Sequence, residues 1–500
     1  MPSEGEKRMK KKLLSVFLAA AVGMSFAGCS GGGEDGGKEE VTVPENSIVL
    51  NISAESNGRR MKGFGAECDP LFISENVGES GTDENGAAWE CKEEDWANVI
   101  EPRIEEINLQ RMRVMLCPSY FCPTYEQYAS ENYAWASEEM SSVYQVLETA
   151  QKLDITVNLT YWGVDALKCP WLAASQEGWM SFPKAEYEEA FCKMFADAVK
   201  YLKEDRGYTC IREITIFNEP NSYGFENYAR ICRMMNEKFI GAGLRDGVEF
   251  NLSDTAENKD WLERCAKELS DISDFLNAHT YSFGYGMTNR EIYEACLDWV
   301  SRMEGCGQDL YFNEFGTNKA TSSHTASDNF DPERGLEICR IAANMVNAGI
   351  VGASYWVLFS QLYNREEVGR YMDMGLWGCA NEGYACRPVF YAYTLLTRFV
   401  PAGAHIYPIS SADENIVAFA VRTPSGKWSY VAVNNSDEAK KLAFRNAGEA
   451  PEGSVKKYVY NVKNVPTDNR VITAYTEIGF EQEYLFDELG GQSVAVYTQL

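Results

Sequence analysis

The chain has 500 residues, which is enough for one large domain and a smaller one. Its hydrophobic content of 45% and aromatic content of 13% exclude a disordered chain and predict a sizeable core. The formal net charge of −28 repels nucleic acid and anionic lipid surfaces, so neither is an expected partner, and it makes a strongly anionic polysaccharide a less natural ligand.

The first 29 residues have the layout of an export signal. A basic stretch from Lys7 to Lys12 precedes a short apolar run over 13–26, and the sequence Ala-Gly-Cys then ends at Cys29. This order resembles a bacterial lipoprotein signal, in which Cys29 is lipidated and becomes the mature N-terminus. We therefore expect lipid anchoring to the bacterial cell membrane or cell surface, outside the cytoplasm. The alternatives are a plain cleaved signal and a membrane anchor, although the run is short for a span.

A linker and then a long alternating region follow. Residues 30–45 are Gly-rich and charged, which predicts a flexible linker. From 62 to 399, helical periodicity alternates with short apolar segments, and the last helix is predicted at 388–399. The predicted strands are 63–69, 111–116, 155–161, 214–219, 249–254, 275–281, 310–315 and 353–358. Eight strands alternating with eight helices predict an α/β protein with a (β/α)8 TIM barrel.

The helical periodicity disappears after Pro401. Strand-like segments separated by turn residues occupy 415–423, 427–435, 456–462 and 493–499. Residues 400–500 are therefore predicted to form a C-terminal antiparallel β-sandwich, and 46–61 are predicted to add an N-terminal strand to it.

The remaining cysteines lie mostly in apolar segments, without the spacing of a zinc site. We expect most of them to be small buried hydrophobes. Cys117 with Cys122, and Cys379 with Cys386, are candidate loop disulfides.

Two predicted strands, the fourth and the seventh, end on the same three residues, Phe-Asn-Glu. Glu219 ends the fourth strand, where Pro220 stops ladder pairing, and Glu314 ends the seventh. In such a barrel the reacting groups project from the C-terminal strand ends. Because strand side chains alternate between faces, Phe217 and Phe312 are expected inside the barrel below the glutamates.

A pair of carboxyl groups is what the hydrolysis of a glycosidic bond needs. When the two groups are about 5–5.5 Å apart, one attacks the sugar while the other protonates the leaving oxygen. Mutual repulsion across this gap is expected to raise the pKa of the acid while its partner stays ionised.

These motifs, Ile-Phe-Asn-Glu-Pro-Asn at 216–221 and Tyr-Phe-Asn-Glu-Phe-Gly at 311–316, resemble the retaining glycoside hydrolases of clan A. The run Gly-Phe-Gly-Ala-Glu at 63–67, preceded by a sandwich strand, is most like family 30, with families 39 and 5 as alternatives. The resemblance implies that Glu219 is the acid/base and Glu314 the nucleophile. It implies that Asn218 binds the sugar 2-hydroxyl.

The resemblance also extends to neighbouring strands. It implies that Arg113 keeps the nucleophile ionised, and Arg111 has the same parity and is its rival. Trp356 matches the tryptophan that forms the floor of the sugar subsite, with barrel packing as the alternative.

Five further residues are candidates from their positions alone. Tyr281 and His279 end the sixth strand and share parity, so either can contact the nucleophile; a core histidine is the alternative for His279. Trp162 and Trp171 follow the third strand and are candidate subsite walls, although surface packing accounts equally well for Trp171. Glu67 ends the first strand, where a sugar contact and a rim position are both open.

The sequence therefore predicts a retaining glycoside hydrolase that acts on a poly- or oligosaccharide and needs no metal or organic cofactor. A non-catalytic carbohydrate-binding lipoprotein, a transglycosylase on the same barrel and a structural lipoprotein with an incidental barrel are the alternatives. The expected partners are a carbohydrate substrate and, through the N-terminal lipid only, a membrane.

Overall fold

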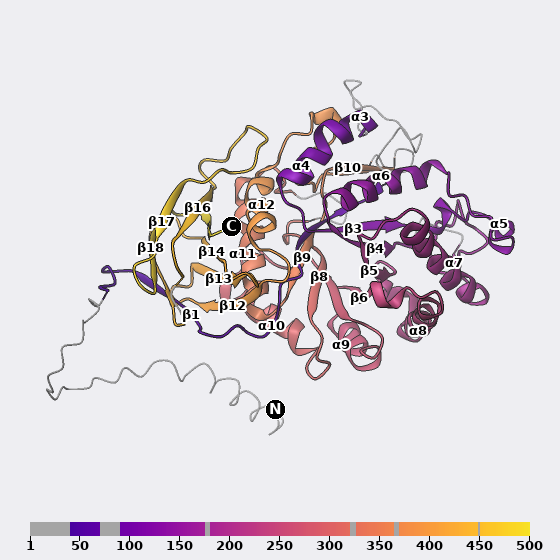
Figure 1. Ribbon diagram of the computed structural model, residues 1–500, viewed down its shortest axis with the longest axis horizontal. Coiled ribbons are helices and arrows are strands. Elements are labelled where there is room, and N and C mark those ends of the chain that lie inside the picture. The colour runs from indigo at the N-terminus through magenta and orange to yellow at the C-terminus, as the bar shows by residue number, and fades with distance from the viewer. Residues whose placement is uncertain (1–40, 71–90, 176–180, 321–326, 365–369, 449–450) are drawn as a thin grey trace. The chain divides into compact units, whose positions relative to one another are not determined.

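The computed structural model describes residues 41–70, 91–175, 181–320, 327–364, 370–448 and 451–500 (Figure 1). The predicted signal with Cys29, and most of the predicted linker, lie outside these residues. Within the described residues, no helix is both long enough and apolar enough to cross a bilayer.

Eight parallel strands close into a barrel in chain order. They are β2 (Gly63–Cys68), β3 (Arg111–Leu116), β4 (Thr156–Tyr161), β5 (Ile211–Ile216), β6 (Glu249–Ala256), β7 (Phe275–Thr280), β8 (Leu310–Phe315) and β9 (Gly352–Tyr355). The connecting helices are α4 (Glu101–Glu106), α6 (Glu138–Lys152), α7 (Glu188–Lys200), α8 (Phe225–Gly241), α9 (Lys259–Glu268), α10 (Asn289–Ser301), α11 (Pro332–Ala348) and α12 (Pro388–Phe399). This alternation confirms the predicted TIM barrel.

Local sequence signals fix the ends of α11. The Asp331 side chain accepts a hydrogen bond from the backbone N–H of Glu333, and Pro332 occupies the first turn, where its missing donor costs nothing. The helix ends at Gly349, whose φ of +98° favours glycine. The helix between these ends connects the loop after β8 to the start of β9.

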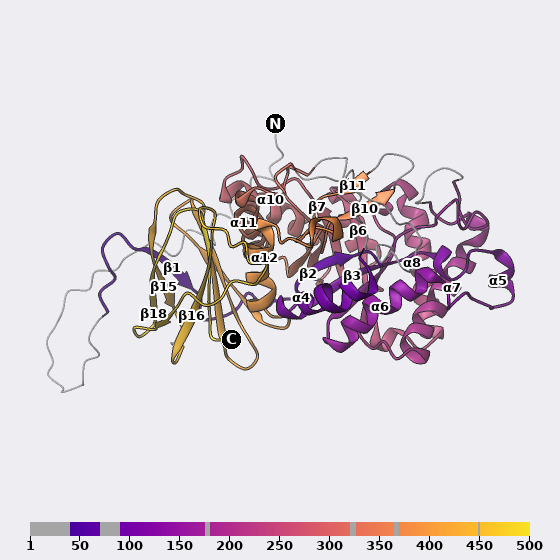
Figure 2. The ribbon, with the colours of Figure 1, turned by 90° about the horizontal axis from the view of Figure 1, so that it is seen from above.

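Nine further strands form one hydrogen-bonded sheet in the order β17-β16-β19-β14-β13-β12-β1-β15-β18 (Figure 2). They are β1 (Ile48–Ile52), β12 (His405–Ser410), β13 (Ile416–Arg422), β14 (Trp428–Asn434), β15 (Lys440–Asn446), β16 (Ser454–Asn461), β17 (Thr476–Gly479), β18 (Tyr484–Leu489) and β19 (Ser493–Thr498). The sheet encloses its own apolar core, which includes Leu50, Phe444 and Tyr497. This is the predicted β-sandwich, and β1 lies in it between β12 and β15.

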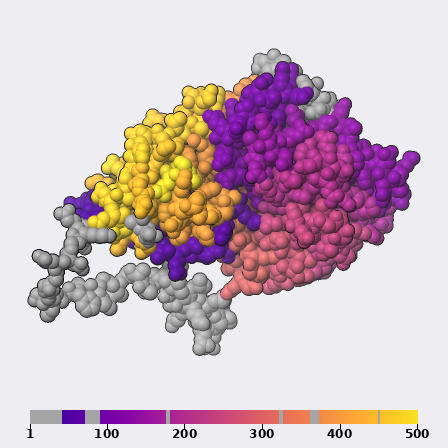
Figure 3. Space-filling view, viewed as in Figure 1, coloured from indigo at the N-terminus to yellow at the C-terminus, as the bar shows by residue number. Residues whose placement is uncertain are grey.

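The sandwich packs directly on the barrel helices. Asn347 at the end of α11 donates a hydrogen bond to the backbone oxygen of Ala418 in β13, and Asn289 in α10 donates to the backbone oxygen of Glu414. Strand residues such as Phe419 belong to the same apolar core as the barrel. In Figure 3 the orange and yellow surface of the C-terminal part lies directly against the purple surface of the barrel.

The barrel interior below the two glutamates is polar, which corrects the expectation for Phe217 and Phe312. Phe217 stacks on Phe191 of α7, and Phe312 packs edge-on against Trp299 of α10, so both rings face the helix layer. Phe217 has a φ of +66°, and the pairing of β8 shifts in register after Phe312, so side-chain alternation breaks at both places.

Hydrogen-bonded amides occupy the interior instead. Asn313 accepts from the Asn251 side chain at 2.8 Å and donates to Thr215 at 3.2 Å. Asn158 also donates to Thr215, at 3.1 Å. These buried polar groups satisfy one another and fill the space beneath the carboxylates.

The fourteen cysteines of the described residues are joined by no disulfide. The two candidate loop pairs, Cys117 with Cys122 and Cys379 with Cys386, are therefore not bridged in this structure. Most of these cysteines are buried, in agreement with a packing role.

Candidate active site

The backbone leaves regular strand geometry where the polar side chains converge. Glu219 has a φ of +48° and precedes the 3-10 helix Pro220–Tyr223. In β6, Ser253 and Asp254 have φ values of +88° and +46° at a register shift. Positive φ in residues other than glycine is strained, and such strain clusters at functional sites. These local distortions re-aim the Glu219 and Asp254 side chains.

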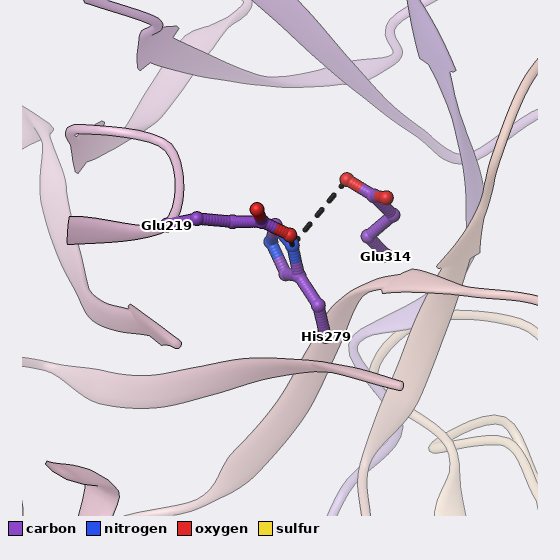
Figure 4. A group of neighbouring side chains, drawn as sticks. All are labelled: Glu219, His279 and Glu314. Carbon is purple, nitrogen blue, oxygen red and sulfur yellow. Dashed lines mark hydrogen bonds and ion pairs between the residues drawn. The ribbon is translucent and has the colours of Figure 1, made fainter. Parts of the chain in front are cut away.

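Glu219 and Glu314 come together at the C-terminal mouth of the barrel. One oxygen of each carboxyl group and one ring nitrogen of His279 all lie within 4.8 Å of one another. Figure 4 shows the three side chains pointing toward one another. The Glu219 side chain is 41% exposed, whereas that of Glu314 is only 10% exposed. One carboxyl group therefore faces solvent and the other lies deeper in the barrel.

Three donors surround the carboxyl group of Glu314. The Tyr281 hydroxyl donates to Oε1 at 2.5 Å, and Arg113 Nη1 donates to Oε2 at 3.3 Å. His279 Nδ1 lies 3.4 Å from the same Oε2. Donors to a carboxylate favour its charged form and fix its orientation. This environment suits a carboxylate that must attack in one direction.

Arg113 is fully buried and organises the centre of the site. Its Nη2 donates to Asn218 Oδ1 at 2.9 Å and to Asp254 Oδ2 at 2.8 Å. Its Nη1 donates hydrogen bonds to both Glu67 and Glu314. Four strands or strand ends thus converge on one guanidinium group. Arg113 therefore ties the nucleophile candidate to the Asn218 amide.

Arg111, the rival of Arg113, lies elsewhere. It pairs with Glu213 near the start of β5 and stacks on Tyr311, at a ring distance of 4.2 Å. Within the described residues, it makes no hydrogen bond or ion pair with Glu314. Position along the strand, and not parity, separates the two arginines.

His279 is a buried cation between carboxylates. Its Nδ1 lies 3.1 Å from Glu219 Oε1 and its Nε2 lies 3.1 Å from Asp254 Oδ1. Burial lowers the pKa of His279, but the charges of Asp254 and Glu314 outweigh burial and raise the pKa to about 10. Because both ring nitrogens then carry protons, neither offers a lone pair to a metal ion, although the spacing of Glu219, His279 and Glu314 alone would suit one.

The two glutamates differ in proton affinity, in the order opposite to the expectation from repulsion alone. Burial raises the pKa of Glu219, but the hydrogen bond and charge of His279 outweigh it, so the net shift is downward. Burial and the charge of Glu219 raise the pKa of Glu314, although His279, Arg113 and Tyr281 oppose this rise. The sequence did not indicate that a histidine cation would lie against the more exposed carboxyl group.

The two tryptophans predicted for the site lie together. Trp162 and Trp356 stack with their ring centroids 5.7 Å apart and an interplanar angle of 16°, and the Arg113 guanidinium lies 5.0 Å from the Trp162 ring. Both are nearly buried. Trp162 is therefore part of the central cluster and does not form an outer wall.

Trp171 lies in a different aromatic group. It stacks on Tyr128 at 5.6 Å and contacts Tyr125 and Tyr187 edge-on. In the part of the chain that the structure describes, no ring contact joins it to the stacked pair of Trp162 and Trp356.

Asp254 also belongs to the central cluster, although its sequence context did not single it out. It is fully buried, and Arg113 and His279 outweigh burial and lower its pKa. Asn313 also donates to it, at 2.8 Å. The available signal was its place as the last residue of the predicted strand 249–254, which is the same position that drew attention to Glu219 and Glu314.

Solved structures of glycoside hydrolases share this fold. A family 30 endoxylanase from Clostridium papyrosolvens aligns with a TM-score of 0.63 and 14% identity, over 90% of this chain and 99% of that chain. An endo-β1,6-glucanase aligns with a TM-score of 0.64 and 16% identity, over 90% and 93%. A family 39 glycoside hydrolase from the gut symbiont Bacteroides cellulosilyticus aligns with a TM-score of 0.57 and 13% identity, over 88% and 81%.

These alignments show that the chain has the fold of these glycoside hydrolases. No protein-family model matches the sequence, and no curated protein matches it.

Proposed function

We propose that this protein is a retaining glycoside hydrolase, which cleaves O-glycosidic bonds of a poly- or oligosaccharide through a covalent glycosyl-enzyme intermediate. The observation that carries the proposal is the approach of Glu219 and Glu314 to within 4.8 Å at the C-terminal mouth of the barrel. Retaining enzymes hold their carboxyl groups about 5–5.5 Å apart, whereas inverting enzymes leave a wider gap for water.

In the first step Glu314 attacks the anomeric carbon. The bond between that carbon and the leaving oxygen breaks, and the oxygen takes a proton from Glu219. Glu314 is suited to this role because Tyr281 and Arg113 hold it in one orientation. Glu219 is suited to the acid role because its side chain is the more exposed of the two and reaches the leaving group.

The proton that Glu219 needs is shared with His279. In the free site the proton resides on His279, 3.1 Å from Glu219 Oε1. A bound glycan displaces water from the exposed side of Glu219, and loss of water favours the neutral carboxyl form. The proton then moves from Nδ1 to Oε1 and on to the leaving oxygen.

In the second step water attacks the anomeric carbon and gives its proton to Glu219, from which it returns to His279 Nδ1, 3.1 Å away. The bond between the sugar and Glu314 breaks, so the carboxylate is restored and the anomeric configuration is retained. Asn218, held by Arg113, is placed to bind the sugar 2-hydroxyl, and Trp356 with Trp162 offers an apolar surface to the sugar ring.

We also propose that the protein is exported and anchored through a lipid on Cys29. The basic and apolar segments that precede this cysteine support the proposal.

The decisive experiment is a screen of neutral polysaccharides and aryl glycosides with the purified chain from residue 30 onward. Proton NMR of the first product then reports its anomeric configuration. A retained configuration, absent with a Glu314→Gln control prepared in parallel, is the expected result. An inverted first product, or turnover by Glu314→Gln, contradicts the proposal.

The same screen separates the other functions considered for this barrel. Products longer than the substrate indicate a transglycosylase, which uses the same intermediate. Glycan binding without any turnover indicates a carbohydrate-binding protein.

A further inference from the structure

Glu67 is a buried carboxyl group at the centre of the site to which the two-step reaction assigns no role. It lies at the C-terminal end of β2, and its side chain is 1% exposed. Its Oε2 accepts from Arg113 Nη1 at 3.0 Å. Its Oε1 is buried and has no hydrogen-bond partner among the described residues. Because almost none of this side chain is exposed, it is not placed to contact the sugar directly.

Arg113 Nη1 is shared between Glu67 and Glu314. The distances are 3.0 Å to Glu67 and 3.3 Å to Glu314. The other terminal nitrogen of Arg113 is already engaged by Asn218 and Asp254. The charge state of Glu67 therefore decides how strongly Nη1 holds Glu314.

The surroundings of Glu67 and Glu314 favour a proton on Glu67 when the two carboxyl groups compete for one. Glu314 has Tyr281, Arg113 and His279 as donors, whereas Glu67 accepts from Arg113 alone among the described residues. An ionised carboxylate with an unpartnered buried oxygen carries the full cost of lost hydration. Glu67 is also the more deeply buried of the two.

The charged groups around Glu67 act in the same direction, with one exception. Burial is the main cause that raises the pKa of Glu67, and the carboxylates of Glu314 from β8 and of Asp69 raise it further. The Arg113 guanidinium from β3 lowers it. The resulting pKa is about 8. The adjacent Cys68 thiol stays neutral, because burial raises its pKa well above the usual value.

We propose that Glu67 is a positioning residue that works in its uncharged form: it holds a proton beside Arg113, so that Nη1 supports the ionised nucleophile Glu314. When Glu67 ionises, the closer carboxylate takes Nη1, and Glu314 loses one of the donors that orient it. The inference rests on the proposed function for its catalytic consequence, whereas the proton on Glu67 is a property of the folded chain alone.

The first test therefore needs no substrate. An unfolded glutamate has a pKa of about 4.3, so between that pH and about pH 8 the folded chain binds one proton that the unfolded chain does not. Folding stability must then fall as pH rises through this window. The Glu67→Gln variant has no titrating group at this position. In thermal unfolding, the melting temperature of the wild type is therefore expected to fall relative to that of the variant as pH rises to about 8. Above that pH the difference is expected to stay constant. Parallel curves across the window overturn the proposal.

The second test measures activity on the substrate found in the screen and uses Asp254→Asn as a matched variant. Both changes replace a carboxyl partner of Arg113 by an amide, but Asp254 is ionised. Near pH 6 we expect a loss in kcat/KM of about threefold for Glu67→Gln and of at least about thirtyfold for Asp254→Asn, because only the latter removes a buried charge.

The pH dependence of kcat/KM distinguishes the positioning role from a merely structural one, because a structural role would not change with pH. We compare the kcat/KM of Glu67→Gln with that of the wild type as a ratio. This ratio is expected to be about threefold higher at pH 9 than near pH 6, because Glu67 ionises in the wild type and the glutamine cannot. Equal losses for the two variants near pH 6, or a ratio that stays constant with pH, overturn the positioning role. If no substrate is found, the unfolding experiment still decides the protonation of Glu67.

Discussion

His279 Nδ1 lies 3.1 Å from Oε1 of Glu219, and this contact couples the charge of the histidine to the proton affinity of the carboxyl group. The histidine cation lowers the pKa of Glu219, and Glu219 in turn helps to keep the histidine protonated. The acid/base candidate and its neighbour therefore behave as one proton-sharing unit.

Replacing His279 by Gln is expected to move the basic limb of the activity profile to lower pH. In the wild type the shared proton is lost only as the pH approaches the pKa of His279, about 10. In the variant Glu219 must hold that proton alone, and a carboxyl group releases it at lower pH even though loss of the cation raises the pKa of Glu219. At the optimum, kcat/KM is expected to fall by about 10- to 100-fold because Glu314 loses a donor. The pH dependence of kcat/KM on an aryl glycoside measures both effects. A basic limb that stays in place would show that His279 does not control Glu219.

The same substitution changes how stability depends on pH. The pKa of His279 is raised from 6.5 to about 10 in the folded chain, so its stabilisation is present below the lower value and lost as pH rises toward the upper one. Thermal unfolding of wild type and His279→Gln is expected to diverge below about pH 10 and to show no further change above it.

Replacing Glu314 by Ala is expected to abolish turnover, with a loss of at least about a thousandfold, because no nucleophile remains. Azide fits the space left by the carboxyl group, so it is expected to restore activity and to yield a glycosyl azide of inverted configuration. Mass spectrometry and NMR of the product check this. If azide gives no such product, Glu314 is not the nucleophile.

Replacing Glu219 by Ala is expected to discriminate between leaving groups. Substrates with an activated leaving group need no proton in the first step, so they retain that step, whereas ordinary glycosides lose about 100- to 10,000-fold. Burst kinetics with a dinitrophenyl glycoside measures the first step. Equal loss on every leaving group contradicts the acid/base role.

Replacing Trp356 by Ala is expected to lower kcat/KM by about tenfold, because the stacked pair with Trp162 loses its flat face. Trp171→Ala is the matched control, since that ring belongs to the separate group around Tyr128. Similar losses in the two variants would place the sugar-binding surface elsewhere.

Replacing Cys29 by Ser tests the proposed anchor. The wild-type chain expressed in a bacterium is expected to partition into the membrane fraction with a lipid-modified N-terminus, and the variant is expected to lose this modification. Membrane fractionation and mass spectrometry of the N-terminal peptide measure the outcome. Equal membrane association without lipid would favour an uncleaved anchor.

Much of the fold was predictable from local patterns. The strand that became β8 was predicted with its observed bounds, and α12 was predicted at 388–399, because apolar periodicity and capping residues act over a few neighbours. In the sandwich, β13, β14, β16 and β19 were predicted, but β12, β15, β17 and β18 were not. The burial pattern of β15, for example, is irregular, and β17 is largely exposed, so neither has a clear alternation.

The errors and omissions at the site have a common cause. Phe312 was expected inside the barrel from alternation, but a register shift turned it outward and left Asn313 in the interior. The sequence did not predict Asp254 as a site residue, because a bulge in β6 directs its side chain to Arg113 and His279. Bulges arise from how neighbouring strands pair, and one strand's residues do not encode that pairing.

By itself the sequence determined the order of strands and helices, and it placed Glu219 and Glu314 at strand ends. It could do so because apolar periodicity and the residues that end strands and helices are local properties. Only the tertiary structure decided which charges meet: it selected Arg113 over Arg111, inserted His279 between two carboxylates and buried Glu67 beside the nucleophile. The physical reason is that proton affinities depend on burial and on distances of a few ångströms between residues far apart in the chain, and closure of the barrel sets those distances.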